Sequence, residues 1–349
     1  MEKRHCIQVH FGDNLDVLKG IPDNHVDLIY IDPPFNTGIR QIRRRFHTED
    51  GCKIFEDTYG YKDSFDDFLG FLKPRLEEAY RILKDHGSLF FHLDYREIHY
   101  CKVLLDTIFG RESFINEIIW AYDYGARSKK KWSAKHDNIL WYAKDPENYT
   151  FNYEDMDRIP YMAPGLVGAE KAARGKTPTD VWWHTIVSPN SKEKTGYATQ
   201  KPLDIIKRIV KIHSHKGDLL MDFFAGSGTL GEAAAQLERD SILVDSNPEA
   251  IEVMKKRFLP YDVEWVNCDA VFIPPKTKRV AGTKRSGTSK RTRTTALQSD
   301  SPASNALAAE VKAAKRKTRT SKTVKTPRKK EHGVAAAASA SSRPDLSLT

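Results

Sequence analysis

The sequence predicts an α/β fold built on a doubly wound, mostly parallel sheet. Short apolar stretches of strand length alternate with longer stretches of helical periodicity over most of residues 7–270. One of the strands, at 27–32, ends in an aspartate before two prolines, and another, at 217–222, ends in an aspartate before a glycine-rich turn. Open sheets of this class bind ligands at the carboxyl ends of their strands. The strand ends are therefore where we expect the functional site.

The expected elements are assigned from periodicity and from turn residues. Strands are expected near 6–13, 27–32, 88–94, 114–122, 137–144, 218–222, 241–245 and 263–270. Helices are expected after Asp13 and over 64–87, 96–110, 199–214, 229–237 and 247–258, with Gly87 as a helix C-terminus. Residues 38–62 have mixed polarity without a clear period and are expected to form a loop, and 145–195 show little periodicity.

The positive charge of the chain is concentrated at its C-terminal end. The net charge is +9, and residues 271–349 contain 19 Lys and Arg against 4 Asp and Glu, so residues 1–270 are mildly acidic. The end segment has few large apolar residues and many Ser, Thr and Ala, a composition that cannot offset its ordering entropy by burial. We expect a folded domain over 1–270 and a disordered basic tail over 271–349. Such a tail can bind phosphates without sequence preference, or simply aid solubility.

Cysteine usage and hydropathy exclude several classes of protein. The four cysteines, Cys6, Cys52, Cys101 and Cys268, form no C-x-x-C pair, so neither a zinc site nor a disulfide framework is expected. No apolar run is long enough to span a bilayer, and the N-terminus lacks the apolar core of a secretory signal. We expect a cytoplasmic protein, nucleoid-associated in a prokaryote, without a metal ion and without membrane contact.

The stretch "DLIYIDPPFNTG" at 27–38 changes abruptly from a buried strand to a stiff turn. Prolines cannot continue a central strand because they lack the amide donor. The turn would therefore present Asp32 and Phe35 on rigid backbone at the carboxyl end of the strand, although X-Pro-Pro turns also occur in ordinary loops.

The stretch "LLMDFFAGSGT" at 219–229 runs from a strand into a helix. Gly226 and Gly228 fit neither the P-loop nor the full dinucleotide pattern. Asp245 closes the next strand, at about the distance where an acid accepts hydrogen bonds from ribose hydroxyls. The pattern favours a ligand that contains adenosine, without a requirement for a pyrophosphate, over an ordinary turn.

Together, "DPPF" and the downstream "DFFAGSGT" resemble the amino-methyltransferases of DNA, which use S-adenosylmethionine (AdoMet). The catalytic motif precedes the cofactor motif, which is the circularly permuted order of the beta class of that family. "FGDNLDVLKGIPDNHV" and "GYATQKPLDIIKRIVKIHS" match as well, so the resemblance covers about residues 7–270. It implies a seven-stranded-type, Rossmann-like methyltransferase sheet with a target-recognition segment at about 123–195.

The resemblance also implies roles for individual residues. Asp32 and the carbonyl of Pro33 would bind the exocyclic amine of the target base, Pro34 would stiffen the turn, and Phe35 would stack on the flipped base. Phenylalanine replaces the commoner tyrosine here. The residues expected around AdoMet are Asp13, Lys201, Pro202, Asp222, Phe224, Ala225, Gly226, Gly228, Thr229 and Asp245. Asp269 is the alternative to Asp13 beside the adenine of the cofactor.

The expected substrate is double-stranded DNA, methylated at N6 of adenine in a specific sequence. The alternatives are methylation at N4 of cytosine, or a DNA-binding protein that has lost catalysis. A separately encoded restriction endonuclease and a second copy of the chain, as a homodimer, are the other partners considered. DNA contacts are expected from Asn36, Arg40, Arg43, Arg44, Arg127, Lys129, Lys130 and Lys131, the last four beside Trp132.

Overall fold

The computed structural model describes residues 6–41, 44–49, 52–57, 61–188, 190–269 and 277–280. These residues belong to one unit, Met1–Thr283, and the second unit, Lys284–Thr349, lies outside them. Arg43 and most of the predicted tail also lie outside the described residues.

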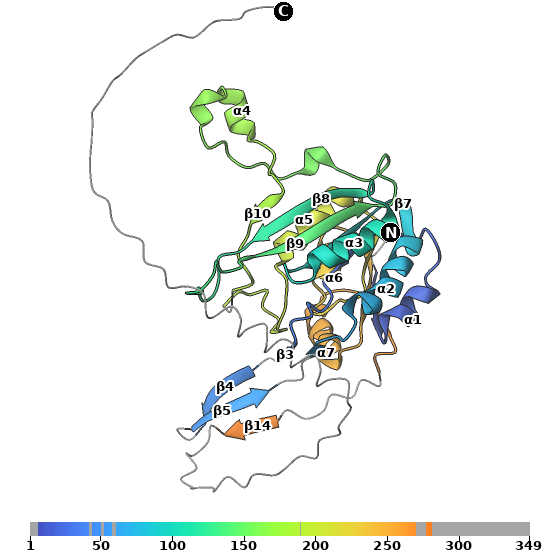
Figure 1. Cartoon of the computed structure of the whole chain (residues 1–349), viewed down its shortest axis with the longest axis vertical. Helices are drawn as coiled ribbons and strands as arrows, with labels where there is room; N and C mark the ends of the chain where they lie inside the picture. The colour runs from blue at the N-terminus through green and yellow to red at the C-terminus, as the bar shows by residue number, and fades with distance from the viewer. Residues whose placement is uncertain are drawn as a thin grey trace, which may run out of the picture. The chain divides into compact units, whose positions relative to one another are not determined.

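The centre of the unit is a nine-stranded sheet with the order β10-β8-β9-β7-β2-β11-β12-β1-β13. Figure 1 labels four of its strands, β10, β8, β9 and β7. Its strands are β10 (Val181–Trp183), β8 (Phe114–Ala121), β9 (His136–Ala143), β7 (Leu83–Leu93), β2 (Val26–Ile31), β11 (Leu219–Asp222), β12 (Asp240–Asp245), β1 (Ile7–Phe11) and β13 (Val263–Val266). Only the pairs β7–β9 and β8–β9 are antiparallel, and the other pairs are parallel. The predicted doubly wound, mostly parallel sheet is confirmed, and its strand number exceeds the expected seven.

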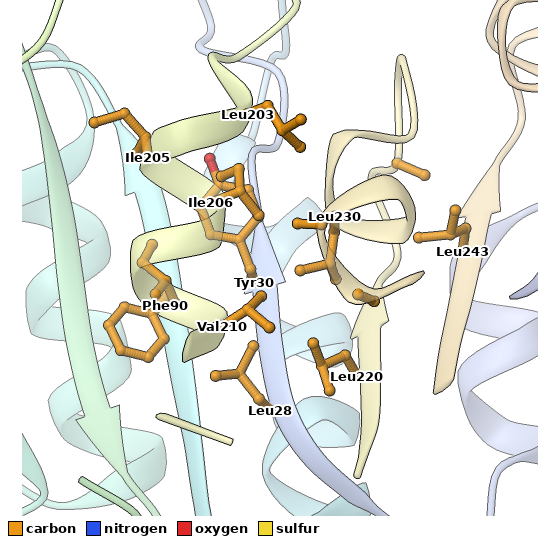
Figure 2. Packing of buried hydrophobic residues seen from close by; sticks show 14 of the residues in the cluster. Leu28, Tyr30, Phe90, Leu203, Ile205, Ile206, Val210, Leu220, Leu230 and Leu243 are labelled. Carbon is orange, nitrogen blue, oxygen red and sulfur yellow. The ribbon is translucent and has the colours of Figure 1, made fainter. Parts of the chain in front are cut away.

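Helices cover both faces of this sheet. Helices α1 (Asn14–Gly20), α2 (Phe68–Ile82) and α3 (Ile98–Phe109) share one apolar cluster with the sheet. Helices α5 (Leu203–His213), α6 (Thr229–Gln236) and α7 (Pro248–Arg257) share the other. Strand β2 contributes to both, because successive side chains of a strand point to opposite faces. Its Leu28 and Tyr30 pack with Ile206 and Val210 of α5 (Figure 2), while Ile29 and Ile31 belong to the opposite cluster.

The sheet places the two halves of the predicted site next to each other. Strand β2 leads into the proline motif, strand β11 leads into the glycine-rich turn, and the two strands pair in parallel, with Leu28 opposite Leu220. Strand β12 pairs with β11 on its other side. Motifs that are far apart in the sequence therefore emerge from neighbouring strands at one edge of the sheet.

Two expectations for the region between the catalytic motif and β7 are wrong. Residues 38–62, expected to be a loop, include β3 (Ile39–Gln41), β4 (Arg44–Glu49) and β5 (Cys52–Asp57), and β6 (Tyr61–Asp63) follows. These strands form antiparallel pairs, β3 with β6 and β4 with β5, which backbone hydrogen bonds can hold without an apolar period. Helix α2 ends at Ile82, and Gly87 lies inside β7, where a Cβ would meet the Asp27 carbonyl oxygen at 2.8 Å.

Two predicted segments contain regular structure. Within the predicted basic tail, β14 (Thr277–Val280) pairs antiparallel with β5, because a basic stretch can still supply backbone donors and acceptors. The target-recognition segment 123–195 includes β9, whose Asn138–Ala143 stretch is buried in the sheet. It also contains the short helix α4 (Ala169–Arg174) and the 3₁₀ turns Tyr153–Asp155 and Pro164–Leu166. Of the helices in the described residues, none is both long and apolar enough to cross a membrane.

Candidate active site

Four acidic residues meet at the carboxyl edge of the sheet. Asp13 follows β1, Asp32 follows β2, Asp222 ends β11 and Asp245 ends β12. All four line one cavity with a volume of about 250 Å³. The sequence predicted each of these acids as a site residue, and the parallel strands bring them together.

The cavity contains most of the predicted cofactor residues. Those that line it are Asp13, Lys201, Asp222, Phe224, Ala225, Gly226, Thr229 and Asp245. Pro202 and Gly228 do not line it: Pro202 is the N-cap residue of α5, and Gly228 is the N-cap residue of α6. Asp269 does not line it either, so Asp13 is the acid that the geometry supports beside the ligand.

The proline motif presents Asp32 to this cavity. The ammonium of Lys201 donates a hydrogen bond to Asp32 Oδ2, and both side chains are largely buried, at 11% and 15% exposed. The other oxygen, Oδ1, is buried and accepts no hydrogen bond from the residues that the structure describes. Lys201 Nζ also lies 5.0 Å from the centre of the Phe35 ring. Pro34 lines the cavity as well, whereas Pro33 and Phe35 of the motif do not.

The loop after the motif is held by a buried acid, Asp63 of β6, which is 1% exposed. Its carboxylate accepts hydrogen bonds from the Asn36 amide at 2.7 Å, from Thr37 Oγ1 at 2.5 Å and from Gln41 Nε2 at 3.1 Å. Asn36 takes a left-handed conformation with φ of 51°, and its side chain donates to Glu97 and accepts from the Phe65 amide. Asn36, predicted as a DNA contact, therefore also fixes the shape of the catalytic loop.

The two glycines of the glycine-rich turn have different reasons to be glycine. Gly226 has φ of +50° and lines the cavity, and its amide donates to Asp245 Oδ2 at 2.7 Å. A Cβ at Gly228 would lie 2.7 Å from the Phe258 ring and 2.8 Å from Met254. Gly226 thus presents bare backbone at the cavity wall, whereas Gly228 lets α7 pack against the turn. The packing role of Gly228 was not predicted, and its ligand role stays a prediction.

The acids at the ends of β11 and β12 have perturbed protonation equilibria. Burial raises the pKa of Asp245 to about 6, although its carboxylate accepts hydrogen bonds from the Asn247 and Gly226 amides. Burial also raises the pKa of Asp222 well above its ordinary range, and the nearby carboxylates of Asp32 and Asp245 add to that shift. Such clustering of perturbed acids in a cavity is typical of functional sites.

Helices α1 and α2 also contribute to the cavity wall. Asp13 is the N-cap residue of α1, where it accepts from the Leu15 amide at 2.8 Å, and both its oxygens lie 3.1 Å from Arg75 Nη2. Arg75 Nε donates to Asn14 Oδ1 at 2.6 Å, and Asn14 Nδ2 donates to the Phe223 carbonyl oxygen at 2.7 Å. This chain of polar contacts ties α2 to α1 and to the start of the glycine-rich turn.

The predicted DNA contacts are only partly described. Arg127 and Lys129 to Lys131 lie exposed on the connection between β8 and β9, beside Trp132, which is 98% exposed. Arg127 forms an ion pair with Asp123 at 2.5 Å. Arg40 lies in β3 and Arg44 begins β4, but their side chains, like the whole of Arg43, lie outside what the structure describes.

Comparison with known proteins identifies the family. The profile of the DNA methylase family matches residues 26–256, which run from the start of β2 almost to the end of α7. The chain belongs to this DNA methylase family. The family assignment confirms the resemblance found from the two motifs, and both motifs lie within the matched residues.

Individual DNA methylases are similar over most of this chain. The type II methyltransferase M.HpaI of Haemophilus parainfluenzae is 32% identical over 260 residues, which are 74% of each chain. The DNA adenine methyltransferase YhdJ of Escherichia coli (strain K12) is 30% identical over 260 residues, 70% of this chain and 80% of YhdJ. Among solved structures, PvuII DNA methyltransferase (cytosine-N4-specific) has a TM-score of 0.52 at 16% identity, covering 74% of this chain and 90% of that one. That last similarity shows a shared fold.

Sequence reasoning missed several residues that line the cavity of this DNA methylase. They are Gly12, Asn14, Tyr30, Phe65, Phe71, Arg75, Tyr197, Thr199, Phe223, Ser227, Ser246 and Asn247. Arg75 left a signal, because it is a charged residue on the apolar side of a predicted helix, where a buried charge needs partners. The aromatic residues that line the cavity gave no such signal, because aromatic side chains are ordinary in apolar segments.

Proposed function

We propose that this DNA methylase transfers the methyl group of AdoMet to N6 of adenine within a specific DNA sequence. The observation that carries the proposal is the shared cavity: Asp32 of the proline motif lines the same cavity as Gly226 and Asp245. The similarity to YhdJ, which is named a DNA adenine methyltransferase, supports adenine as the target.

The residues at the cavity fit AdoMet. Gly226 offers backbone without a side chain, and Asp245 offers a carboxylate at a strand tip, where ribose hydroxyls are commonly bound. Asp13 and Asn14 offer polar groups to the same cavity, and Phe71 offers an aromatic ring. Bound in this cavity, AdoMet would supply an electrophilic methyl group.

The residues of the proline motif fit the activation of an exocyclic amine. Such an amine is a weak nucleophile because its lone pair is delocalised into the ring. Hydrogen bonds from the amine to the Asp32 carboxylate and to the Pro33 carbonyl would draw it toward tetrahedral geometry and free the lone pair. Phe35 would stack on the base, which must leave the duplex to reach the motif. Because the residues act by holding the amine in place, positioning supplies much of the rate.

Lys201 adds a constraint to this chemistry. Its ammonium donates to Asp32 Oδ2 and lies over the Phe35 ring. The target amine needs the same carboxylate and the same ring face, so it must share or replace this donor. A carboxylate oxygen has two lone pairs, so Asp32 Oδ2 can accept from the ammonium and from the amine together, with Lys201 holding the carboxylate in place.

We propose the predicted basic residues as DNA contacts of this enzyme. Arg127 and Lys129 to Lys131 are exposed and basic, as phosphate contacts require. The basic segment 271–349, described only at 277–280, would add a nonspecific electrostatic contribution that weakens as salt rises. We also propose a separately encoded restriction endonuclease and a second copy of this chain, as a homodimer, as partners.

Mass spectrometry of nucleosides tests the proposed function. The purified protein is incubated with AdoMet and unmethylated genomic DNA, and the DNA is digested and its nucleosides are weighed. We expect N6-methyladenine at positions that share one short sequence. N4-methylcytosine would keep the mechanism and contradict the target base, and unmodified DNA would contradict the proposed function.

A further inference from the structure

A chain of polar side chains is buried directly behind Asp32. It consists of Tyr30 on β2, His92 on β7, Asp137 on β9 and Tyr122 after β8. The imidazole of His92 is fully buried, and Tyr30 and Asp137 are 2% and 7% exposed. Burying polar groups costs free energy unless they are paired, so a core that served only packing would favour apolar side chains here.

His92 contacts three groups of the catalytic strand. Its Nδ1 lies 2.7 Å from the Tyr30 hydroxyl and 4.0 Å from Asp32 Oδ1. The centre of its ring lies 6.0 Å from the centre of the Phe35 ring. One imidazole therefore hydrogen-bonds the hydroxyl and lies beside the inner carboxylate oxygen and the aromatic ring, and all three groups belong to β2 or the motif that follows it.

Asp137 holds the other side of the imidazole. His92 Nε2 lies 3.4 Å from Asp137 Oδ2, close enough for strong attraction although Nε2 has no well-aligned hydrogen bond. Tyr122 donates to Asp137 Oδ1 at 3.0 Å. Burial alone would raise the pKa of Asp137, but contacts with His92, Lys201 and Tyr122 outweigh it and lower that pKa. Because the ionised carboxylate only accepts hydrogen bonds, the proton of a neutral His92 belongs on Nε2, and Tyr30 then donates to Nδ1.

The two buried atoms without a partner complete the argument. Asp32 Oδ1 and His92 Nε2 both belong to the five buried side-chain atoms, among the described residues, that have no hydrogen-bond partner. Unsatisfied polar atoms are rare in native cores and require an explanation. Both atoms lie in this one chain, which ends at the catalytic carboxylate.

We propose that His92, held by Asp137, is a positioning residue for Asp32 and Phe35. The imidazole occupies the space behind the inner carboxylate oxygen and beside the ring without a hydrogen bond to either, and so limits their orientations to ones that present Asp32 Oδ2 to the amine of the target base. This inference rests on the proposed function, because it concerns the orientation of the group that would bind the amine. It adds to the motif a residue from β7 and a residue from β9.

The test compares substitutions that keep different parts of the imidazole. His92→Asn keeps a polar group near the position of Nδ1, His92→Gln keeps one near Nε2, and His92→Phe keeps only the shape. His213→Phe is the matched control, because His213 is another buried histidine that packs against Phe90 and Trp141 and does not line the cavity. For each variant, kcat, KM for DNA, Kd for AdoMet and Tm are measured.

We expect His92→Phe to lower kcat roughly tenfold or more, with Kd for AdoMet unchanged. His92→Asn should retain more of kcat than His92→Gln, because the Nδ1 side faces Asp32 and Tyr30. His213→Phe should lower Tm and leave kcat near the wild-type value. If His92→Phe does not fold, the comparison of Asn with Gln decides the question.

Two results would overturn the inference while leaving the proposed function intact. One is a His92→Phe variant whose kcat equals that of the wild-type enzyme, when the wild-type enzyme is itself active in a separate assay. The other is a Gln variant that is as active as the Asn variant, which would show that Nδ1 has no special role. Failure of the wild-type protein to methylate any DNA would instead overturn the proposed function, and this inference with it.

Discussion

Lys201 and Asp32 are 169 positions apart in the sequence, and the ammonium of one donates a hydrogen bond to the carboxylate of the other. Lys201 lies two positions before α5, and Asp32 immediately follows β2, so the pair joins the start of a helix that covers the sheet to the strand that carries the proline motif. Because both side chains are largely buried, water screens this pair weakly. The pair makes the orientation of the Asp32 carboxylate depend on a residue outside the motif.

Substitution of Lys201 should reduce catalysis more than folding. Hydrogen bonds to charged groups contribute about 1.5–3 kcal/mol, so we expect Lys201→Met to lower kcat/KM roughly tenfold to a hundredfold. Steady-state methylation of a cognate duplex measures this. Lys216→Met is the control, because Lys216 forms an ion pair with Glu238 at the surface, where both side chains are more than half exposed. An equal loss in both variants would show that Lys201 has no role at the site.

Substitution of Asp63 should loosen the catalytic loop. Asp63→Ala removes the acceptor for three donors, and an unsatisfied buried donor costs about 1–3 kcal/mol. We expect the free energy of unfolding to fall by about that amount, and kcat to fall while Kd for AdoMet is kept. Urea denaturation and methylation assays measure the two effects. Asp66→Asn, at an exposed position three residues further on, should change neither, and a wild-type kcat in Asp63→Ala would contradict the anchoring role.

Substitution by alanine should have different effects at the two glycines of the turn. A Cβ at Gly226 would enter the cavity wall 3.1 Å from the Tyr197 ring, so Gly226→Ala should weaken AdoMet binding. A Cβ at Gly228 would strike Phe258 in the core, so Gly228→Ala should mainly lower Tm. Isothermal titration and thermal unfolding separate the two effects. If the folded Gly228 variant alone lost AdoMet binding, the division of roles would be wrong.

The pKa of Asp245 makes AdoMet binding dependent on pH. Burial raises this pKa to about 6, and the proposed role as acceptor for ribose hydroxyls needs the ionised carboxylate. We therefore expect AdoMet affinity to fall as pH decreases through about 6. For the free energy of unfolding of the protein without AdoMet, the pH dependence has the opposite sign. The native state binds the proton of Asp245 more tightly than the unfolded chain does. The stability due to this group is therefore present at low pH and is lost as pH rises from about 4 to about 6.

Asp245→Asn is the control for both effects. The amide cannot ionise, so the variant should lose the change of AdoMet affinity near pH 6 and the corresponding change of stability. Titrations of AdoMet at several pH values measure the first, and urea denaturation over the same range measures the second. A variant that kept the full pH dependence would assign it to another group, with Asp222 as the first candidate because its pKa is also raised.

The parts of the site that could be predicted from sequence are those whose signal is local. The proline motif and the glycine-rich turn each combine an apolar strand with turn residues over about ten positions, and the parallel sheet then brings them together. Gly228 was assigned to the ligand because the sequence does not show that Phe258 packs against it. A glycine is required at position 228 because of Phe258, which lies thirty positions further along the chain and so outside any local sequence pattern.

The parts that could not be predicted depend on tertiary partners. His92 lies in the apolar stretch "SLFFHLD" and reads as one polar residue in a core strand, and only the pairing of β7 with β9 brings it near Asp137. Strands β3 to β6 were missed because they pair with each other through backbone hydrogen bonds and need no apolar alternation. In both cases the information lies in which strands become neighbours.

The central claim is that Asp32 activates the target amine beside AdoMet bound at the same strand edge. The most direct measurement is a single turnover with AdoMet that carries a deuterated methyl group, comparing the wild-type enzyme with Asp32→Asn on one cognate duplex. We predict deuterated N6-methyladenine from the wild type, at least about a hundredfold slower transfer from the variant, and equal Kd for AdoMet in both. Equal rates of transfer, or loss of AdoMet binding in Asp32→Asn, would contradict the account.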